Sequence, residues 1–349
     1  MPALPLPPAT ISTSALPLIA EAMQASGVDA TRAFAESGLA RPDRIRRGAA
    51  TAAVDLPLAQ FTDLMQAGGS QAPDEGRMWR CGQAIAAPAL AELFPAGLAA
   101  RRLDGLLDGL LADLQSLQHG TAFKRSVADD TCILTYRIID PAIWPRSRDA
   151  EFTLAFLDAV VRRFAGDTGN DAFPVALSFE HERDTGAPLA RLAGSAPLYG
   201  QPSNMLAFPA RLLETPVHPT PADPGLRRAS DRRPPAAPLA ITEPCCTQII
   251  EAIYWRLGQG QLNQSRIAED CGLSERSLRR QLDRRGQSFR SLVDDARTAY
   301  ALWALRETHL PVGEIAWRLG YDDQGAFARA FRRAAGTSPS RFRQQSGRD

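Results

Sequence analysis

Apolar residues recur at intervals of three and four positions over much of the chain, which is the spacing of amphipathic helices. In the first third of the sequence this spacing predicts helices over residues 16–25, 29–37, 58–68 and 103–117. The last of these carries six leucines on one face, between positions 106 and 117. The chain is therefore expected to begin with a helical region.

Shorter stretches alternate between apolar and polar residues, which predicts strands. Residues 121–127 and 132–139 form two such stretches, and the polar pair Asp129-Asp130 between them is typical of a hairpin turn. A helix follows over 152–164, then a strand over 174–182 and a second hairpin over 199–208, turning near Ser203-Asn204. The order helix-strand-strand thus occurs about twice. It predicts an α+β domain with a helical start and two related halves.

Prolines set the next boundary, because residues 214–244 carry eight of them among polar residues. Neither helix nor sheet interiors tolerate that density, so we interpret the segment as a semi-rigid linker. We expect a disordered, Pro/Ala-rich lead-in over 1–14, an effector-binding and dimerisation domain over 15–213, the linker over 214–244, and a second domain over 245–345.

The second domain is predicted to be all-α. Helices are expected over 246–257, 264–271, 275–285, 289–307, 312–319 and 324–335, with a short one starting at Ser340. Within it one short pattern occurs twice, with its two alanines, Ala268 and Ala316, 48 residues apart. Each alanine directly follows an isoleucine, and a glycine stands four positions after the alanine. A bulky apolar residue follows the glycine.

Each copy of this pattern has the construction of a helix-turn-helix. A small residue on the inner face of the first helix allows the second helix to approach closely. The glycines, Gly272 and Gly320, supply the positive φ of a tight turn. Leu278 and Phe327 then hold the second helix against the first. Two units in tandem predict a protein that reads duplex DNA at two successive major grooves.

The second helix of the first unit carries three arginines on the side away from its apolar face. Ser274 stands at the N-cap position, Ser277 follows three residues later, and Arg276, Arg279 and Arg280 face outward. A recognition helix presents such side chains to base edges and phosphates. The alternative is an ordinary solvated helix face, and this helix alone leaves the two interpretations about even.

The corresponding helix of the second unit is less basic. Asp322 or Asp323 caps it, and Gln324, Arg329 and Arg332 face outward. Glutamine pairs with adenine and arginine with guanine in the major groove. We expect this helix to contribute more to positioning than to base readout.

The helix predicted over 289–307 separates the two units by about 28 Å, whereas successive major grooves of B-DNA are roughly 34 Å apart. Binding both grooves therefore requires the DNA to bend or the units to flex.

Charge supports this division of the chain. The net charge is only +1, but the segment from Ile241 onward holds 17 Arg against 13 Asp and Glu, near +4, which leaves about −3 elsewhere. Lys124 is the only lysine, a bias that we attribute to a high-GC genome.

No apolar run approaches the roughly 20 residues of a membrane helix. Five scattered cysteines suit a reducing cytoplasm, where we place the protein.

Residues 267–342 resemble the tandem helix-turn-helix domain of AraC/XylS transcription regulators. The segments that carry the resemblance most specifically are 312–316, 319–321, 327–333 and 336–343. The resemblance implies that Arg276, Arg279 and Arg280 contact bases or phosphates from the first recognition helix, and that Gln324 and Arg329 do so from the second. The chain departs from the pattern at Gly325, where relatives often carry a side chain that reaches a base.

Residues 15–217 resemble the effector-binding domain of the ornithine-utilisation subgroup of the same family. The resemblance is carried by 148–152, 174–181 and 199–208. It implies a regulator whose N-terminal domain binds a small molecule and dimerises, and it favours activation over repression.

A mixed polar stretch offers candidates for the effector site. Trp144, Arg148, Asp149 and Glu151 could surround an amine or amino acid through cation–π contact and ion pairs. A surface loop anchored by one tryptophan is the simpler alternative. Glu180 and Glu182 share a strand face and could also meet a cation, although a satisfied structural pair or a solvated edge is favoured there.

No catalytic, cofactor or metal constellation stands out in the sequence. Cys81 has no second cysteine nearby, Cys245-Cys246 lack CxxC spacing, and the four histidines are scattered. We therefore expect no enzyme but a one-component regulator, an activator, whose partners are promoter DNA, RNA polymerase, a small effector and a second copy of the chain. The alternative is a DNA-binding protein whose N-terminal domain only dimerises.

Overall fold

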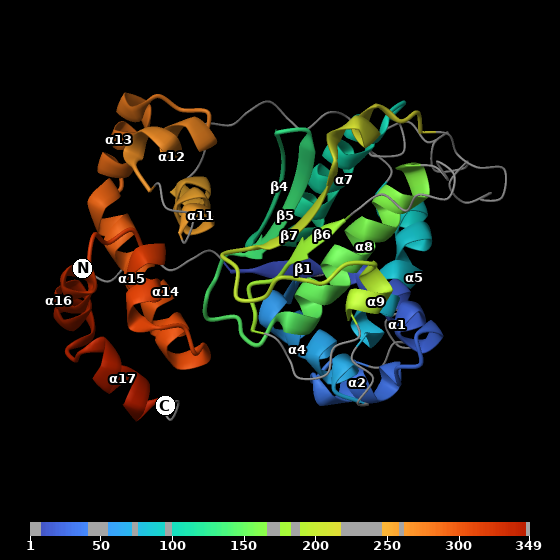
Figure 1. Cartoon of the computed structure of the whole chain (residues 1–349), viewed down its shortest axis with the longest axis horizontal. Coiled ribbons are helices and arrows are strands. Elements are labelled where there is room, and N and C mark those ends of the chain that lie inside the picture. Colours follow the sequence, from blue (N-terminus) through green and yellow to red (C-terminus); the bar gives the residue numbers. More distant parts are fainter. Residues whose placement is uncertain are drawn as a thin grey trace. The chain divides into compact units, whose positions relative to one another are not determined.

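The computed structural model describes residues 8–40, 55–71, 76–94, 100–165, 175–182, 189–217, 246–257 and 262–346 (Figure 1). The chain separates into two compact units, one formed mainly by residues 8–237 and the other mainly by 238–349. Each unit is described by itself below.

The N-terminal unit contains a four-stranded sheet in the order β4-β5-β7-β6. Its strands are β4 (Thr121–Ala128), β5 (Thr131–Ile138), β6 (Ala176–Ser178) and β7 (Asn204–Pro209). Asp129 and Asp130 join β4 to β5 with φ of 45° and 62°. Two successive positive φ values are those of a type I′ turn, whose twist matches a hairpin. The hairpin predicted at this position is confirmed.

Two helices pack on this sheet, α7 (Leu103–Leu117) against β4 and α8 (Ser147–Ala165) against β7. The strand β7 alternates, so that Leu206 and Phe208 are buried while the residues between them are partly open. The element order α7-β4-β5 then α8-β6-β7 repeats helix-strand-strand, as predicted, with the short helix α9 (Leu189–Ala193) inserted in the second half.

The helical start is also confirmed. It comprises α1 (Leu16–Ala25), α2 (Ala30–Glu36) and α4 (Leu58–Gly69). A further helix, α5 (Arg77–Glu92), runs beside α8 and forms the most extensive helix pair among the described residues (Figure 1). Gly82 makes this approach possible. A Cβ there would overlap the carbonyl oxygen of Phe152 and lie 2.8 Å from the Cβ of Ala155.

A second, small sheet in the order β2-β1-β3 closes one side of the unit. Its strands are β1 (Thr10–Ser12), β2 (Asp55–Pro57) and β3 (Gln118–His119). A one-turn helix η1 (Thr13–Ala15) follows β1, and both Ile11 and Ala15 are buried. The prediction of a disordered lead-in over 1–14 is therefore wrong from Thr10 on, because buried apolar side chains and strand pairing order these residues. Residues 1–7 lie outside the described part.

Two further expectations need correction. Residues 199–208 form no hairpin: only β7 is a strand, because Gly200, with φ of 65°, and Pro202 interrupt the extended backbone before it.

The linker predicted over 214–244 begins too early. The helix η2 (Ala210–Glu214) and the residues after it belong to the N-terminal unit, where the Val217 N–H donates to the Arg101 carbonyl at 2.9 Å. The rest of that prediction, 218–244, lies outside the described residues.

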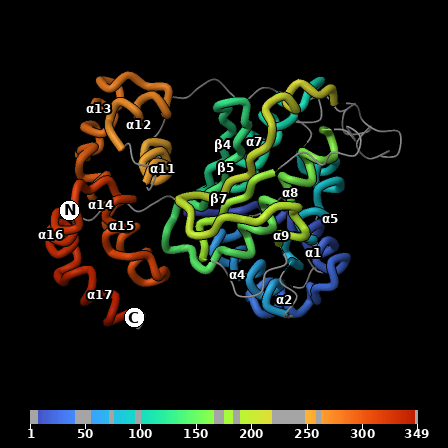
Figure 2. The backbone as a smooth tube through the Cα atoms, viewed as in Figure 1, coloured from blue at the N-terminus to red at the C-terminus, as the bar shows by residue number. Residues whose placement is uncertain are grey.

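The C-terminal unit is helical throughout its described residues, as predicted. Its helices are α11 (Cys246–Arg256), α12 (Gln264–Asp270), α13 (Glu275–Asp283), α14 (Phe289–Glu307), α15 (Val312–Arg318), α16 (Gln324–Ala335) and α17 (Pro339–Gln345). The backbone trace in Figure 2 shows the long helix α14 running between the pair α12–α13 and the helices α15–α17. It packs against α11, α15, α16 and α17, so it forms the spine of this unit.

Candidate nucleic-acid interface and ligand cavity

Both copies of the repeated pattern fold as predicted, into closely packed helix pairs. Ala268 and Ala316 are each 2% exposed, so neither leaves space between its helix and the next. Gly272 and Gly320 have φ of 64° and 73°. After each glycine the next N–H reaches back to the alanine carbonyl, at 2.8 Å from Leu273 and 3.0 Å from Tyr321. This is the Schellman closure of a helix, and its repetition gives the two turns the same geometry.

The helix α13 presents the residues predicted for the first recognition helix. Ser274 is its N-cap: the hydroxyl oxygen accepts the Ser277 N–H at 3.1 Å. Leu278 and Leu282 are buried against the rest of the unit. Arg276, Arg279 and Arg280 are all exposed, and none forms an ion pair or hydrogen bond with the described residues.

Unpaired arginines gathered on one short helix form a concentrated positive surface. A guanidinium offers a planar fork of donors that suits guanine edges and phosphate oxygens. No acidic partner within the described chain holds these three side chains, so no internal ion pair has to break when they meet an anion. The first two turns of α13 can therefore bind a polyanion.

The helix α16 has the same design, but its arginines, Arg329, Arg332 and Arg333, lie further from its N-terminus. Asp323, rather than Asp322, is the N-cap, accepting the Ala326 N–H at 2.7 Å. Gln324, Arg329 and Arg332 are exposed, as predicted. Phe327 and Phe331 are buried on the opposite face, with ring centroids 5.8 Å apart.

The structure gives a physical reason for glycine at position 325. A Cβ there would lie 2.9 Å from Oδ1 of Asp323, the oxygen that caps the helix, and 3.4 Å from Nη1 of Arg329. A side chain would compete with the cap for the same space. Glycine at this position therefore preserves the Asp323 cap of α16 and leaves the space beside the Arg329 guanidinium unfilled.

The four residues predicted to surround an effector do not share one pocket. On α8, Arg148 and Glu151 lie one turn apart and pair with each other at 2.8 Å. Successive residues of a helix point about 100° apart around its axis, so Asp149 lies on a different face of α8 from Arg148. Trp144 precedes the helix, with the Arg146 guanidinium carbon 5.9 Å from its ring centroid.

Glu180 has a structural role rather than a free face. Its two carboxylate oxygens meet Arg137 at 2.7 Å and Arg146 at 2.9 Å, and all three side chains are about 5% exposed. His181 is buried beside the rings of Phe179 and Tyr199. The structural ion pair favoured for this region is therefore present.

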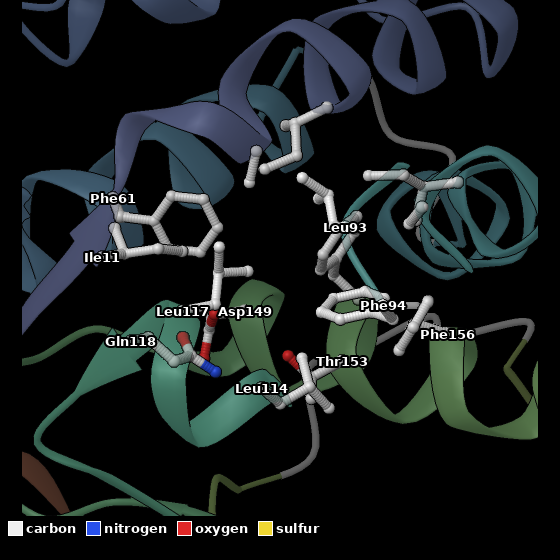
Figure 3. Close-up of a pocket in the computed structure, with 15 residues that line it drawn as sticks. Ile11, Phe61, Leu93, Phe94, Leu114, Leu117, Gln118, Asp149, Thr153 and Phe156 are labelled. Carbon is white, nitrogen blue, oxygen red and sulfur yellow. The ribbon is translucent and has the colours of Figure 1, made fainter. Parts of the chain in front are cut away.

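A cavity of about 50 Å³ lies inside the N-terminal unit, and Asp149 lines it. Its wall is mostly apolar and comes from β1, η1, α1, α4, α5, α7, β3 and α8. The lining residues are Ile11, Ala15, Ile19, Phe61, Ile85, Ala89, Leu93, Phe94, Leu114, Leu117, Gln118, Asp149, Phe152, Thr153 and Phe156. Figure 3 shows the polar groups of Gln118, Asp149 and Thr153 on one side of this space, with the aromatic rings of Phe61 and Phe94 flanking it.

Asp149 is the one ionisable residue among these lining residues, and it is 1% exposed. The Tyr136 hydroxyl donates to its Oδ2 at 2.6 Å, whereas Oδ1 has no hydrogen-bond partner among the described residues. Burial raises the pKa of Asp149 from 3.8 to about 6, against the opposing effects of Tyr136 and Arg146. Near neutral pH this carboxylate is therefore mostly ionised, at a cost to folding.

Comparison with known protein families accounts for both units. A helix-turn-helix domain model matches residues 267–345, which span α12 to α17. A model for the N-terminal arabinose-binding domain of AraC transcription regulators matches residues 27–217, more than half of the chain. The chain belongs to the AraC family of transcription regulators.

Individual AraC-type relatives differ in how much of the chain they match. An ornithine utilization regulator of Pseudomonas aeruginosa is 34% identical over 158 residues, 44% of this chain and 45% of its own length. The chain thus spans under half the length of this relative. The transcriptional regulator VirS of Mycobacterium tuberculosis is 25% identical over 300 residues, 84% of this chain and 85% of its own.

Among solved structures, the transcriptional regulator CdpR of Pseudomonas aeruginosa aligns with 93% of this chain and 97% of its own. The two are 20% identical, with a TM-score of 0.36. The relatives are regulators of transcription rather than enzymes. No helix in the described part of this AraC-family chain is long and apolar enough to cross a membrane.

Sequence reasoning missed most of the cavity. Gln118 and Thr153 carry its other polar groups, and Ile85 and Ala89 come from α5, which the sequence pattern did not predict. The sequence holds little signal for them, since the cavity forms only where eight separate elements converge.

The described residues show no metal cluster, and the Cys81 thiol is not reactive. No group of three or more His, Cys, Asp or Glu that could hold a metal occurs among them. Burial raises the pKa of the Cys81 thiol to about 12, which keeps it protonated and inert.

Proposed function

We propose that this AraC-family regulator binds promoter DNA through α13 and α16 in two successive major grooves, and that a small molecule in its N-terminal unit controls this binding. The unpaired, exposed Arg276, Arg279 and Arg280 carry the proposal. Their positions at the front of a capped helix suit contact with base edges, where a recognition helix enters the groove.

The two reading helices have different roles in this proposal. The helix α13 supplies most of the base recognition, because Arg276, Arg279 and Arg280 all lie within its first two turns. On α16, Gln324, Arg329 and Arg332 supply fewer contacts, and the acidic cap at Asp323 weakens attraction to phosphate. The second unit therefore mainly fixes the register of the protein on the duplex.

The remaining parts of the proposal concern control. We propose that the protein is a cytoplasmic activator that acts on RNA polymerase as a homodimer, and that its effector is an amino acid or an amine. The similarity to a regulator of ornithine utilization supports this class of effector. The ligand acts by binding one arrangement of the dimer or domains more tightly than another.

Substitution of one arginine tests the DNA interface. An operator is first selected from random duplex DNA by the full-length protein. Arg280→Ala is expected to weaken binding by about 1–3 kcal/mol, roughly 5- to 150-fold, if the guanidinium pairs with guanine. Arg280→Lys keeps the charge but loses the bidentate fork, so it should restore affinity for phosphate but not the base preference.

The matched control is Arg32→Ala, which removes an exposed arginine from α2 in the other unit, where it pairs with Glu36 at 2.7 Å. This variant should bind the operator as the parent does. If Arg280→Ala binds with unchanged affinity and unchanged base preference, the assignment of α13 as the recognition helix is wrong.

A further inference from the structure

A groove in the C-terminal unit lies between α14 and α16 and carries an excess of positive charge. Its volume is about 540 Å³, and much of its wall is apolar. Three arginines line it, Arg290 and Arg297 from α14 and Arg333 from α16, against one acidic residue, Asp294. The lining residues thus hold two positive charges in excess, which suits an anion.

Two of these arginines lie near one aromatic ring. The Arg297 guanidinium carbon is 5.0 Å from the centroid of the Tyr321 ring. Burial raises the pKa of Tyr321 above its usual value, and the charges of Arg297 and Arg333 both act to lower it. Because Coulomb interactions weaken with distance, this effect indicates that both guanidiniums lie close to the Tyr321 hydroxyl.

The arginines of the groove are not neutralised by strong internal ion pairs. The side chains of Arg297 and Arg333 form no ion pair or hydrogen bond with the described residues. For Arg290, Nε lies 4.0 Å from Asp294 Oδ2, and the arginine side chain is 93% exposed. Ion pairs as open as this contribute little to stability. An anion can therefore enter the groove without breaking a strong contact.

Arg333 connects the groove to the DNA-reading face of α16. It also lines a neighbouring hollow on that helix, together with Ala328, Arg329 and Arg332. Arg329 and Arg332 are two of the side chains through which α16 is proposed to meet DNA. The exposed Arg290 side chain at the other end suits a long polyanion that passes over the groove better than a small enclosed ligand.

We propose that this groove binds the sugar–phosphate backbone of duplex DNA beside the major groove that α16 enters, with Arg290, Arg297 and Arg333 as positioning residues. The inference rests on the proposed function, since it adds a backbone contact to the base contacts named there. Phosphate contacts fix register but carry no sequence information. Asp294, whose side chain is 58% exposed, opposes the contact because its carboxylate repels phosphate.

Arg333→Gln tests the inference, because Arg333 is exposed and its replacement does not disturb the core. The full-length variant is titrated with the selected operator and with random duplex DNA of equal length, at several salt concentrations. Both affinities should fall by the same factor, roughly three- to tenfold at 100 mM salt, and the salt dependence should lose about 0.9 of its slope. Arg297→Gln should have the same effects.

Asp294→Asn should act in the opposite direction and strengthen binding to both duplexes, a gain that a folding defect does not produce. The control is Arg306→Gln, which removes the same charge from the other end of α14. There the guanidinium pairs with Glu307 at 2.7 Å and does not line the groove. This control should leave the affinity and the salt slope unchanged.

Three results would overturn the inference: an unchanged affinity and salt slope in Arg333→Gln, a loss confined to the operator, or weaker binding by Asp294→Asn. The first would leave the groove to an acidic segment of a protein partner, and the second would make Arg333 a base-reading residue. Arg280→Ala is measured beside them. A changed base preference in Arg280→Ala with silent groove variants would sink only the present inference, and the reverse result would sink only the recognition helix.

Discussion

At the residue scale, Asp149 is a position that lowers the stability of the folded chain. A carboxylate that is 1% exposed and has one oxygen unpaired destabilises the folded state, and a hydrophobic residue would fit its surroundings better. The sequence could indicate Asp149 as a polar candidate. It could not show that Arg148 and Glu151 satisfy each other while Asp149 faces the cavity, because that depends on where α8 begins and how it is rotated.

The pH dependence of stability should reveal this cost. Because the pKa of Asp149 is raised to about 6 in the folded state, the folded chain takes up this proton more readily than the unfolded chain. The group therefore destabilises the protein most above pH 6, and the penalty disappears as the pH falls toward 4. Asp149→Asn, which is always neutral, should gain up to about 3 kcal/mol over the parent at pH 8.

Urea unfolding of both proteins between pH 4 and pH 8 measures this difference, and the contributions of other groups cancel. Tyr136→Phe provides a comparison, because loss of the hydroxyl that stabilises the charged form should make the stability fall more steeply above pH 6 than in the parent. A constant difference between Asp149→Asn and the parent over the whole range would contradict the raised pKa.

At the scale of elements, the helices with one apolar face were predictable, and those buried on several sides were not. The periodicity placed α1, α7, α14 and α16 at their observed bounds. It missed α5, because Pro88 interrupts the helical pattern and the apolar residues around it do not form a single stripe. It also placed the start of α8 five residues late, because the first turn holds polar residues that are buried only by neighbouring elements.

The α5–α8 pair depends on the absence of one side chain. Replacing a helical glycine by alanine is normally stabilising by up to about 1 kcal/mol. At Gly82 the added methyl would overlap the backbone of α8, so Gly82→Ala should instead destabilise the protein by roughly 1–3 kcal/mol. Thermal or urea unfolding measures the effect.

Gly313→Ala in α15 is the matched control. It also adds a methyl inside a helix, but the nearest atom is the end of the flexible Gln324 side chain, 3.4 Å away. Its stability should stay at or slightly above that of the parent. If Gly82→Ala is as stable as this control, the two helices do not pack as closely as the structure has them.

At the scale of the whole molecule, the tandem repeat determined most of what the sequence could predict about function. Ala268 and Gly272, with their counterparts Ala316 and Gly320, act locally, and local geometry is what a sequence pattern specifies well. The cavity escaped prediction because it depends on contacts between segments more than 100 residues apart, such as Ile11 and Phe156.

Two reading helices joined by the 19-residue α14 should impose a shape on DNA. The helix is about 28 Å long, and successive major grooves are about 34 Å apart, so both contacts form together only if the duplex bends or the two units flex. Footprinting should show protection in two successive major grooves per protomer. Electrophoresis of circularly permuted fragments should show a bend centred between them.

The control is the double variant Gln324→Ala with Arg329→Ala, which weakens only the second contact. It should reduce the bend while leaving the protection under α13. Protection of a single groove by the parent protein would show that the two units do not bind together, whereas protection of both grooves on a straight duplex would show that the units flex.

The unpaired state of Arg276, Arg279 and Arg280 also bears on how the protein finds its site. Since no ion pair within the described part of the chain holds them, any duplex should attract them before a base is read, through release of the counterions that surround DNA. We therefore expect the protein to spend time on arbitrary sequence, sliding and hopping between sites. An effector for such a protein need not bring it to the chromosome; it has only to change how long the protein stays at each place it visits.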